Sequence, residues 1–368
     1  MRNVCIVFFS LVFSWIGSVA SESSMEEPYV NVYNWYGYIP PKILEQFEKE
    51  TGIKVRYDLY DSNEILVAKL LAGNSGYDVV FPSIVPFLSS LIIAKAVQPL
   101  DKRQLPNLKN LDPNITKRMQ VIDPNLEHSV PFLWGTQGFA YVEERVKALM
   151  PDAPIDNYRM LFDPEVVRRL SSCGISLLEE SIDVYSAVFS YLGMDPESDN
   201  QEDLKRASEQ LRQVRPYISR FLSAGVVSEL VNGGICLAQT WVGDVQLAKR
   251  QAKEAGKSIT IHYVIPEEGT TMWIDVMSIP QGAPHPKNAH KFINFLLRPD
   301  IIASITNTIY FANPNKASWR FIDSSIRKDP AIYPPAKVMA KLSLEKLNTP
   351  NYEKIRTRMW TEIRHKHS

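Results

Sequence analysis

The sequence has no excess of either charge. Its 41 lysines and arginines balance 41 aspartates and glutamates, and it contains no basic run with interleaved aromatic residues, which is the usual mark of nucleic-acid binding. Beyond residue 20, no apolar stretch approaches the roughly 20 residues that span a bilayer. We therefore expect no nucleic-acid partner and no membrane-spanning helix in the processed chain.

The short motifs of common catalytic and cofactor sites are also missing. No G-x-G-x-x-G, G-x-S-x-G or H-E-x-x-H occurs, and Gly73-Asn-Ser-Gly76 lacks the lysine of a phosphate-binding loop. Ser83 follows a predicted strand, but the sequence places no base beside it, so we expect a hydroxyl that hydrogen-bonds a ligand. Paired carboxylates leave glycoside hydrolysis as an alternative. We predict that the protein is not an enzyme and holds neither a cofactor nor a metal.

The only long apolar stretch lies at the N-terminus. Met1 and Arg2 precede an apolar run from Val4 to Ile16, and Gly17-Ser-Val-Ala20 follows it. A charged start, an apolar core too short to span a bilayer and a small-x-small end are typical of a secretory signal peptide. We predict that residues 1–20 are removed and that the mature protein is soluble and periplasmic.

Cysteine is scarce, and one of the three cysteines, Cys5, lies inside the predicted signal peptide. Only Cys173 and Cys236 then remain. An even pair in an exported chain favours one structural disulfide, with two free buried thiols as the alternative.

Strand and helix patterns alternate over the first part of the mature chain. We predict strands at 29–35, 53–60 and 78–81 and helices at 40–50 and 63–71. This order implies an α/β fold with a mostly parallel sheet, whose carboxyl-end loops carry Trp35 to Tyr38 and Ser83 to Val85.

About 350 mature residues exceed what one core usually covers, so we expect two lobes. The strand pattern at 131–142 crosses to the second lobe, a strand at 259–265 runs back, and a third passage lies near 309–312. The predicted boundaries are 26–134 plus 257–308 for lobe 1, and 135–256 plus 309–368 for lobe 2. Several crossings make a hinge with a cleft between the lobes.

Two segments place an indole close to a carboxylate. Trp273 and Asp275 lie two positions apart in a strand-like run and so share a face. Trp241-Val-Gly-Asp244 follows a second apolar run. An ionised carboxylate beside an aromatic wall suits a cationic ligand. The alternative is that each tryptophan belongs to a core and each aspartate to a turn or cap.

Ordered matches along nearly the whole mature chain carry a resemblance to a known family. They are Tyr33-Asn-Trp-Tyr-Gly-Tyr38, Phe47-Glu-Lys-Glu-Thr-Gly-Ile53, Asp61-Ser-Asn-Glu64, Pro82-Ser83, Trp241-Val-Gly-Asp244, Trp273-Ile-Asp275, Phe295-Leu-Leu-Arg-Pro-Asp300 and Ile332-Tyr-Pro-Pro335. The chain resembles the periplasmic polyamine-binding proteins of ABC importers, and most of all the putrescine-binding type. The resemblance implies a two-lobed α/β fold of the type II periplasmic-binding-protein kind, a strand hinge and a disulfide between Cys173 and Cys236.

The resemblance also implies a ligand box between the lobes. Trp35 and Trp241 would flank the methylene chain of the ligand, and Asp244 and Asp275 would hold its ammonium groups. The other positions carried over are Tyr36 and Tyr38 at the mouth, the hydroxyls of Ser83 and Ser223, Asp183, Trp273 and Phe311.

Four positions depart from the family's pattern. Asp183 stands where relatives often have the longer glutamate, and Phe311 stands where they tend to have tyrosine. After Trp35 relatives usually carry a hydroxyl residue and an acid, whereas this chain has Tyr36 and Gly37. Tyr36 would then fill part of the space that the acid served, and putrescine and spermidine both stay open as ligands.

The function implied by the resemblance is capture of a polyamine and its delivery to a membrane ABC permease by a monomeric protein. A polyamine sensor that docks on a membrane signalling partner would need the same pocket and is the alternative.

Overall fold

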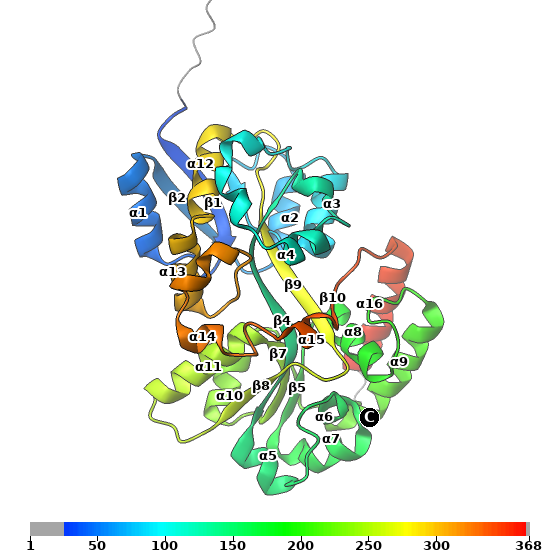
Figure 1. Cartoon of the computed structure of the whole chain (residues 1–368). Coiled ribbons are helices and arrows are strands. Elements are labelled where there is room, and N and C mark those ends of the chain that lie inside the picture. Colours follow the sequence, from blue (N-terminus) through cyan, green and yellow to red (C-terminus); the bar gives the residue numbers. More distant parts are fainter. Residues whose placement is uncertain (1–25, 366–368) are drawn as a thin grey trace, which may run out of the picture.

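The structure is a computed structural model, and it describes residues 26–365. The predicted signal peptide, residues 1–20, lies outside the described residues. The chain forms two bodies that are joined by long strands and by the segment that contains α14 and α15 (Figure 1).

The first body is built on a parallel sheet with the strand order β2-β1-β3. The chain enters through β1 (Tyr29–Trp35), α1 (Pro41–Thr51), β2 (Lys54–Tyr60), α2 (Asn63–Leu71) and β3 (Val79–Val80). Gly52 ends α1 at a positive φ of 73°, and the Ser62 side chain caps α2 by accepting a hydrogen bond from the backbone N–H of Ile65. These local signals explain why the observed elements lie close to those expected from the sequence.

The second sheet has seven strands and mixed direction. It has the order β10-β9-β4-β7-β5-β6, and β8 also pairs with β4. Its strands are β4 (Val130–Val142), β5 (Ile175–Leu177), β6 (Arg220–Phe221), β7 (Leu237–Trp241), β8 (Ile261–Val264), β9 (Thr270–Met277) and β10 (Leu342–Leu344). Strand β4 runs antiparallel to β7, β8 and β9, whereas the β5–β6, β5–β7 and β9–β10 pairs are parallel.

Strands β4 and β9 connect the two bodies (Figure 1). Residues 130–136 of β4 pair with β9, and residues 137–142 pair with β7 and β8. Every residue of β4 is buried. Asp275, near the end of β9, forms a bridge to Ser83, and Ser278, just after β9, forms one to Val80. The hinge strands therefore reach the first sheet directly.

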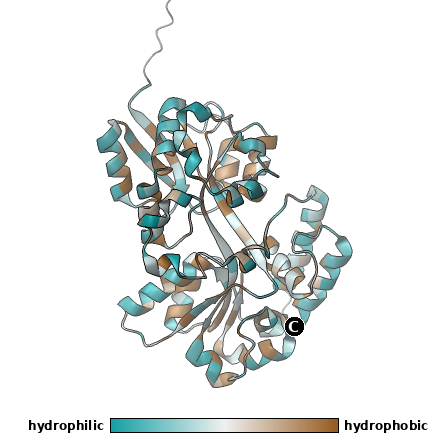
Figure 2. Ribbon diagram, viewed as in Figure 1, coloured by the Kyte–Doolittle hydropathy of each residue, from teal (hydrophilic) through white to brown (hydrophobic). Residues whose placement is uncertain are grey.

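Helices cover both sheets. Those formed by residues 63–119 and 286–309 are α2, α3 (Ser89–Ile93), α4 (Pro113–Met119), α12 (Pro286–Leu296) and α13 (Pro299–Ile309). Those formed by residues 143–254 are α5 (Glu143–Leu149), α6 (Arg159–Phe162), α7 (Pro164–Leu170), α8 (Ser181–Tyr191), α9 (Gln201–Val214), α10 (Val226–Asn232) and α11 (Val242–Glu254). The chain ends with α14 (Ser324–Arg327), α15 (Ala336–Met339) and α16 (Pro350–His365). Figure 2 shows hydrophilic and apolar residues in alternation along these helices, as expected for helices with one face on a sheet and the other in solvent.

The last part of the chain contacts both bodies. Ile322, Ile332 and Leu342 share one apolar cluster with Trp134 and Ile274 of the hinge strands. Helix α16 instead packs Trp360 against Tyr185 and Phe221 in the second body. The lobe boundaries given above stay a prediction.

The structure contains the disulfide between Cys173 and Cys236, whose Cα atoms lie 5.5 Å apart. It links the end of α7 to the start of β7, 63 residues later in sequence. Within residues 26–365, no helix is both long enough and apolar enough to cross a membrane.

Candidate functional site

The carboxylate of Asp275 is the best-defined group of the candidate site. Asp275 is 2% exposed in β9. Its Oδ1 accepts a hydrogen bond of 2.6 Å from the Ser83 hydroxyl, and its Oδ2 accepts one of 2.8 Å from the Tyr38 hydroxyl. Burial raises the pKa of Asp275 to about 6, and these two hydrogen bonds limit the rise.

The donors to Asp275 are themselves held in place. Asn63 donates its Nδ2–H to the Ser83 hydroxyl at 3.0 Å and accepts the Ser83 backbone N–H at 3.1 Å. The indole N–H of Trp35 donates to the carbonyl of Phe81 at 2.9 Å, and the Trp35 ring lies 6.0 Å from that of Tyr38. The loops after β1 and β3 therefore bring Trp35, Tyr38 and Ser83 to one place beside β9.

Trp273 and Phe311 form an aromatic wall next to Asp275. Their ring centroids lie 5.0 Å apart at an interplanar angle of 82°, and Phe311 also meets the Tyr38 ring edge-on at 5.6 Å. Two glycines make room for this wall. A Cβ on Gly135 would lie 2.5 Å from the Trp273 ring, and one on Gly243 would lie 1.9 Å from the Phe311 ring.

Asp244 supplies a second carboxylate from the first turn of α11. Its Oδ2 accepts a hydrogen bond of 2.8 Å from the Thr240 hydroxyl. Burial raises the pKa of Asp244 to about 6, against hydrogen bonds from Thr240 and from the backbone N–H of Trp241. Burial raises the pKa of Tyr38 most, and the negative charges of Asp275 and Asp244 both raise it further, so both carboxylates lie near that hydroxyl.

Asp183 forms a third acidic position at the start of α8. It is 8% exposed, and its Oδ1 accepts a hydrogen bond from the side chain of Gln137 in β4. Gln239 in β7 completes this network by donating to the Gln137 side chain at 3.0 Å. Burial, and then the neighbouring charges of Glu345 and Glu180, raises the pKa of Asp183 well above its ordinary value.

Trp241, Ser223 and Tyr36 are less closely tied to this group. Trp241 is half-buried at the end of β7, directly opposite Gln137 of β4. The Ser223 hydroxyl donates to Glu180 and accepts the backbone N–H of Glu179 at 3.0 Å. Tyr36 is 82% exposed, so its ring does not fill a buried space. The ligand-contact roles of all these residues stay predictions.

Charge distinguishes this site from an ordinary protein interior. Asp183, Asp244 and Asp275 all have raised pKa values, and among residues 26–365 no lysine, arginine or histidine forms an ion pair with any of them. Burying a carboxylate without a cation costs several kcal/mol. The group is therefore suited to a ligand that brings positive charge of its own.

Sequence reasoning missed the two glycines, Gln137 and Glu345. Gly243 lies inside the Trp241-Val-Gly-Asp244 motif, so its position within the candidate site was visible although its contact with Phe311 was not. Gly135 contacts Trp273 on another strand. Gln137 lies 46 positions from Asp183 and 102 from Gln239. Neither residue therefore carries a local signal. Within the described residues, no cluster of three metal-ligating side chains occurs.

Comparison with known proteins places this arrangement in a family. A family model described as bacterial extracellular solute-binding protein matches residues 42–334. The putrescine-binding periplasmic protein SpuD of Pseudomonas aeruginosa (strain UCBPP-PA14) is 43% identical over 96% of this chain and 97% of its own length. The putrescine-binding periplasmic protein PotF of Escherichia coli (strain K12) is 41% identical over 95% of this chain and 94% of its own length.

Solved structures show the same fold. A putative spermidine/putrescine ABC transporter protein from Listeria monocytogenes superposes with a TM-score of 0.78 at 29% identity, over 92% of this chain and 99% of that one. The spermidine/putrescine ABC transporter substrate-binding protein PotD of Streptococcus pneumoniae gives a TM-score of 0.80 at 24% identity, over 91% and 98%. The α/β two-lobed fold expected from the sequence is confirmed.

Proposed function

The chain belongs to the bacterial extracellular solute-binding proteins, which bind solutes and are not enzymes, and from that premise we propose that it captures a polyamine between its lobes. The proposed ligand is an extended diamine, with putrescine before spermidine because the two relatives at 43% and 41% identity are named putrescine-binding proteins.

One observation carries the proposal: three buried carboxyl groups have no cationic partner in the described part of the chain, and one of them, Asp275, lies beside the aromatic wall of Trp273 and Phe311. Each ammonium of a diamine needs about one carboxylate in a partly dry site. Asp275, with the hydroxyls of Ser83 and Tyr38, would hold one ammonium, and Asp244 the other. Trp35, Trp273 and Phe311 offer apolar and π surfaces to the methylene chain between them.

Asp183 adds acidic potential at a third position. Burial and the neighbouring charges of Glu345 and Glu180 raise its pKa, and its Oδ1 already accepts a hydrogen bond from the Gln137 side chain. Asp275 and Asp244 instead both act on the Tyr38 hydroxyl. We therefore assign the two ends of a diamine to Asp275 and Asp244, and the additional amine of spermidine to Asp183.

The wider role follows from the family. The protein would act as an exported, periplasmic monomer that delivers its ligand to a membrane ABC permease, and nucleic acid would not be a partner. Because the walls of the site come from loops of the first sheet, from hinge strand β9 and from α11, one ligand can touch all of them together, and binding would favour a closed arrangement of the lobes.

Titration calorimetry against putrescine, cadaverine, agmatine and spermidine tests the proposal. Butylamine serves as the control, because it has the same carbon chain as putrescine but a single ammonium. We expect diamines to bind at least about tenfold more tightly than butylamine, as the second charge-assisted hydrogen bond dictates, and to be recovered unchanged. Equal affinity for putrescine and butylamine, or no binding of any amine, would refute it.

A further inference from the structure

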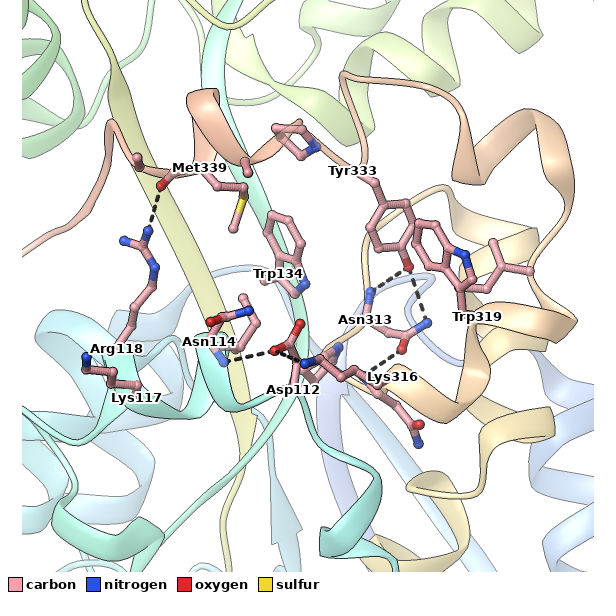
Figure 3. A pocket seen from close by; sticks show the side chains of 17 residues that line it. Asp112, Asn114, Lys117, Arg118, Trp134, Asn313, Lys316, Trp319, Tyr333 and Met339 are labelled. Atoms are coloured by element: carbon pink, nitrogen blue, oxygen red, sulfur yellow. Dashed lines mark hydrogen bonds and ion pairs between the residues drawn. The ribbon is translucent and has the colours of Figure 1, made fainter.

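A second cavity lies on the other side of the hinge strands. It has a volume of about 720 Å³ and is lined by α4, by β4, by the segment after α13 and by α15. Figure 3 shows Trp134, Trp319 and Tyr333 around it, with Asp112, Lys316 and Arg118 nearby. The volume is within the range that small-molecule sites occupy.

The pairing of β4 with β9 separates this cavity from the candidate polyamine site. Trp134 is paired with Ile274, whereas the next residue, Gly135, is paired with Trp273. Residues directly opposite each other on antiparallel strands share a face, and successive residues face opposite sides. Trp134 therefore faces away from Trp273 and Asp275, and none of the residues proposed to contact the polyamine lines the cavity.

The walls of the cavity are aromatic and fixed. The rings of Trp319 and Tyr333 meet edge-to-face at 5.1 Å, and those of Trp134 and Tyr333 at 6.1 Å. The Tyr333 hydroxyl accepts the backbone N–H of Asn313 at 3.2 Å, which holds the ring in position. Met339 adds a polarisable apolar side chain. These walls suit a flat, apolar body.

The charge of the lining is opposite to that of the polyamine site. Lys117, Arg118 and Lys316 line the cavity together with one acid, Asp112. Asp112 is already paired with Lys316 at 3.3 Å, and Arg118 binds the carbonyls of Met339 and Leu342 at 2.6 and 2.7 Å. The excess of cations repels a polyammonium ion and attracts an anion.

Trp134 supplies a donor without an acceptor. Its side chain is 5% exposed, and its indole Nε1–H has no hydrogen-bond partner among the described residues. In Figure 3 the nitrogen edge of the indole points toward the side of the cavity that carries Asp112 and Lys316. A buried donor left unpaired is unfavourable. Because Nε1 is closed to solvent in the ligand-free structure, an oxygen of a ligand would satisfy it once the indole turns toward the cavity.

We propose that this cavity is a second ligand site, which takes a small organic carboxylate with an aromatic or otherwise flat apolar body. The ring of the ligand lies against Trp319 and Tyr333, and its carboxylate accepts from Trp134 Nε1 beside the ammonium of Lys316. The proposal goes beyond polyamine capture and does not depend on it.

The probe is 3-phenylpropionate, and its neutral control is 3-phenylpropanamide, which has the same shape. Binding to the full mature protein is measured by saturation-transfer NMR titration, with and without saturating putrescine. We expect the acid to bind and the amide to bind at least about tenfold more weakly, because the charge-assisted contacts are lost. Displacement of the acid by putrescine would place it in the other cleft and overturn the proposal, as would equal binding of acid and amide or no binding of either.

Variants with matched controls locate the site. Trp134→Phe removes the indole N–H and should weaken binding of 3-phenylpropionate about three- to tenfold, whereas the same change at the exposed Trp319 should have a smaller effect. Lys316→Gln should weaken it similarly. Lys109→Gln, which alters the net charge equally but lies outside the lining, should not. Putrescine titration of each variant shows that it is folded. Unchanged affinity for the acid in both Trp134→Phe and Lys316→Gln would refute the assignment.

Discussion

Trp273 packs directly against the backbone of Gly135, its partner across the β4–β9 pair, so closely that a Cβ on Gly135 would lie 2.5 Å from the indole. The glycine is needed here for its lack of a side chain. It lets the indole lie against the hinge strand, beside Asp275 and in contact with Phe311. The position of the aromatic wall thus depends on a residue that need not touch the ligand.

Gly135→Ala should therefore reduce putrescine affinity by displacing Trp273. Overpacking of this kind typically disturbs a site by about 1–3 kcal/mol, so we expect a loss of about five- to a hundredfold in calorimetric titrations. A double-mutant cycle supplies the control. In a Trp273→Ala background the clash is absent, and Gly135→Ala should then change affinity little further. Additive losses in the cycle would show that Gly135 acts in some other way.

Asp275→Asn should stabilise the ligand-free protein while it weakens amine binding. The pKa of Asp275 is raised from 3.8 to about 6, and a shift of about two units corresponds to roughly 3 kcal/mol spent on holding the charged form near neutral pH. Asparagine keeps the shape, and the hydroxyls of Ser83 and Tyr38 can rotate to accept from its amide. We expect a higher melting temperature at pH 7.5 without ligand and at least about tenfold weaker putrescine binding.

The comparison must be made on protein freed of bound amine. Amine bound to the wild-type protein would raise its melting temperature, so the variant, which binds amine more weakly, would melt lower for that reason alone. Dialysis from denaturant, followed by refolding, removes it. Asp244→Asn is a second variant of the same kind and should behave alike. A lower melting temperature for both variants, in protein shown to be amine-free, would contradict the view that these carboxylates are kept charged at a cost.

The raised pKa values also set a pH dependence. Asp244 and Asp275 both have ligand-free pKa values of about 6, and only their ionised forms hold an ammonium. Putrescine affinity should be level above about pH 7 and fall as the pH drops below about 6, by up to tenfold per unit for each group. Calorimetry between pH 5 and 8, in buffers of different ionisation enthalpy, measures both the affinity and the protons released.

Ligand-free stability should change in the opposite direction. Because the folded-state pKa values lie above the ordinary value of 3.8, the folded protein binds these protons more tightly than the unfolded chain. The contribution of these two groups to the free energy of unfolding therefore rises as the pH falls from about 7 to about 4. An affinity for putrescine that is unchanged from pH 8 to pH 5 would show that neither Asp244 nor Asp275 titrates in this range, and would contradict both pH predictions.

The sequence was sufficient for the elements with local signals. The strand at 29–35 and the helix at 63–71 appear with the predicted bounds, because alternation defines the first and the Ser62 cap defines the start of the second. The passage near 309–312 was harder. Helix α13 runs to Ile309 and ends at Tyr310 with a positive φ of 63°. Since neither glycine nor asparagine marks that end, the sequence gives no stop signal, and only a single bridge joins Ala312 to Trp134.

The site shows the same limit. Trp273 and Asp275 were visible as a pair because strand geometry puts positions two apart on one face. The hydrogen bond from Ser83 to Asp275 joins residues 192 positions apart, and without the resemblance no pattern in the sequence connects them. Glu345 directly follows β10, and its contact with Asp183 at the start of α8 likewise arises only from the tertiary arrangement. Tertiary contacts of this kind fix the charge state of the site, so sequence alone identified the chemistry of the ligand better than the protonation of the groups that hold it.

The turn after Trp35 offers the most direct test of how the acids of the site determine affinity. Gly37 has a φ of 76°, and a Cβ at this position would meet nothing within 4 Å. Gly37→Asp would therefore find space, and aspartate and asparagine tolerate the left-handed region better than other residues with a side chain. If the carboxylate reaches an ammonium of the ligand, one charge-assisted hydrogen bond is gained, less the ordering of one side chain. We expect putrescine to bind about three- to thirtyfold more tightly. Butylamine should gain less, because its single ammonium is already held.

Gly37→Asn is the matched control, since it has the same shape and the same backbone strain without the charge. It should bind putrescine no better than the wild-type protein, and both variants should melt at a similar, slightly lower temperature. Tyr36→Ser, which removes the exposed ring beside this position, separates an effect of Tyr36 from that of the acid. A Gly37→Asp protein that melts like Gly37→Asn but binds putrescine no more tightly would mean that this turn does not reach the ligand, and that Asp244 and Asp275 already satisfy both of its ends.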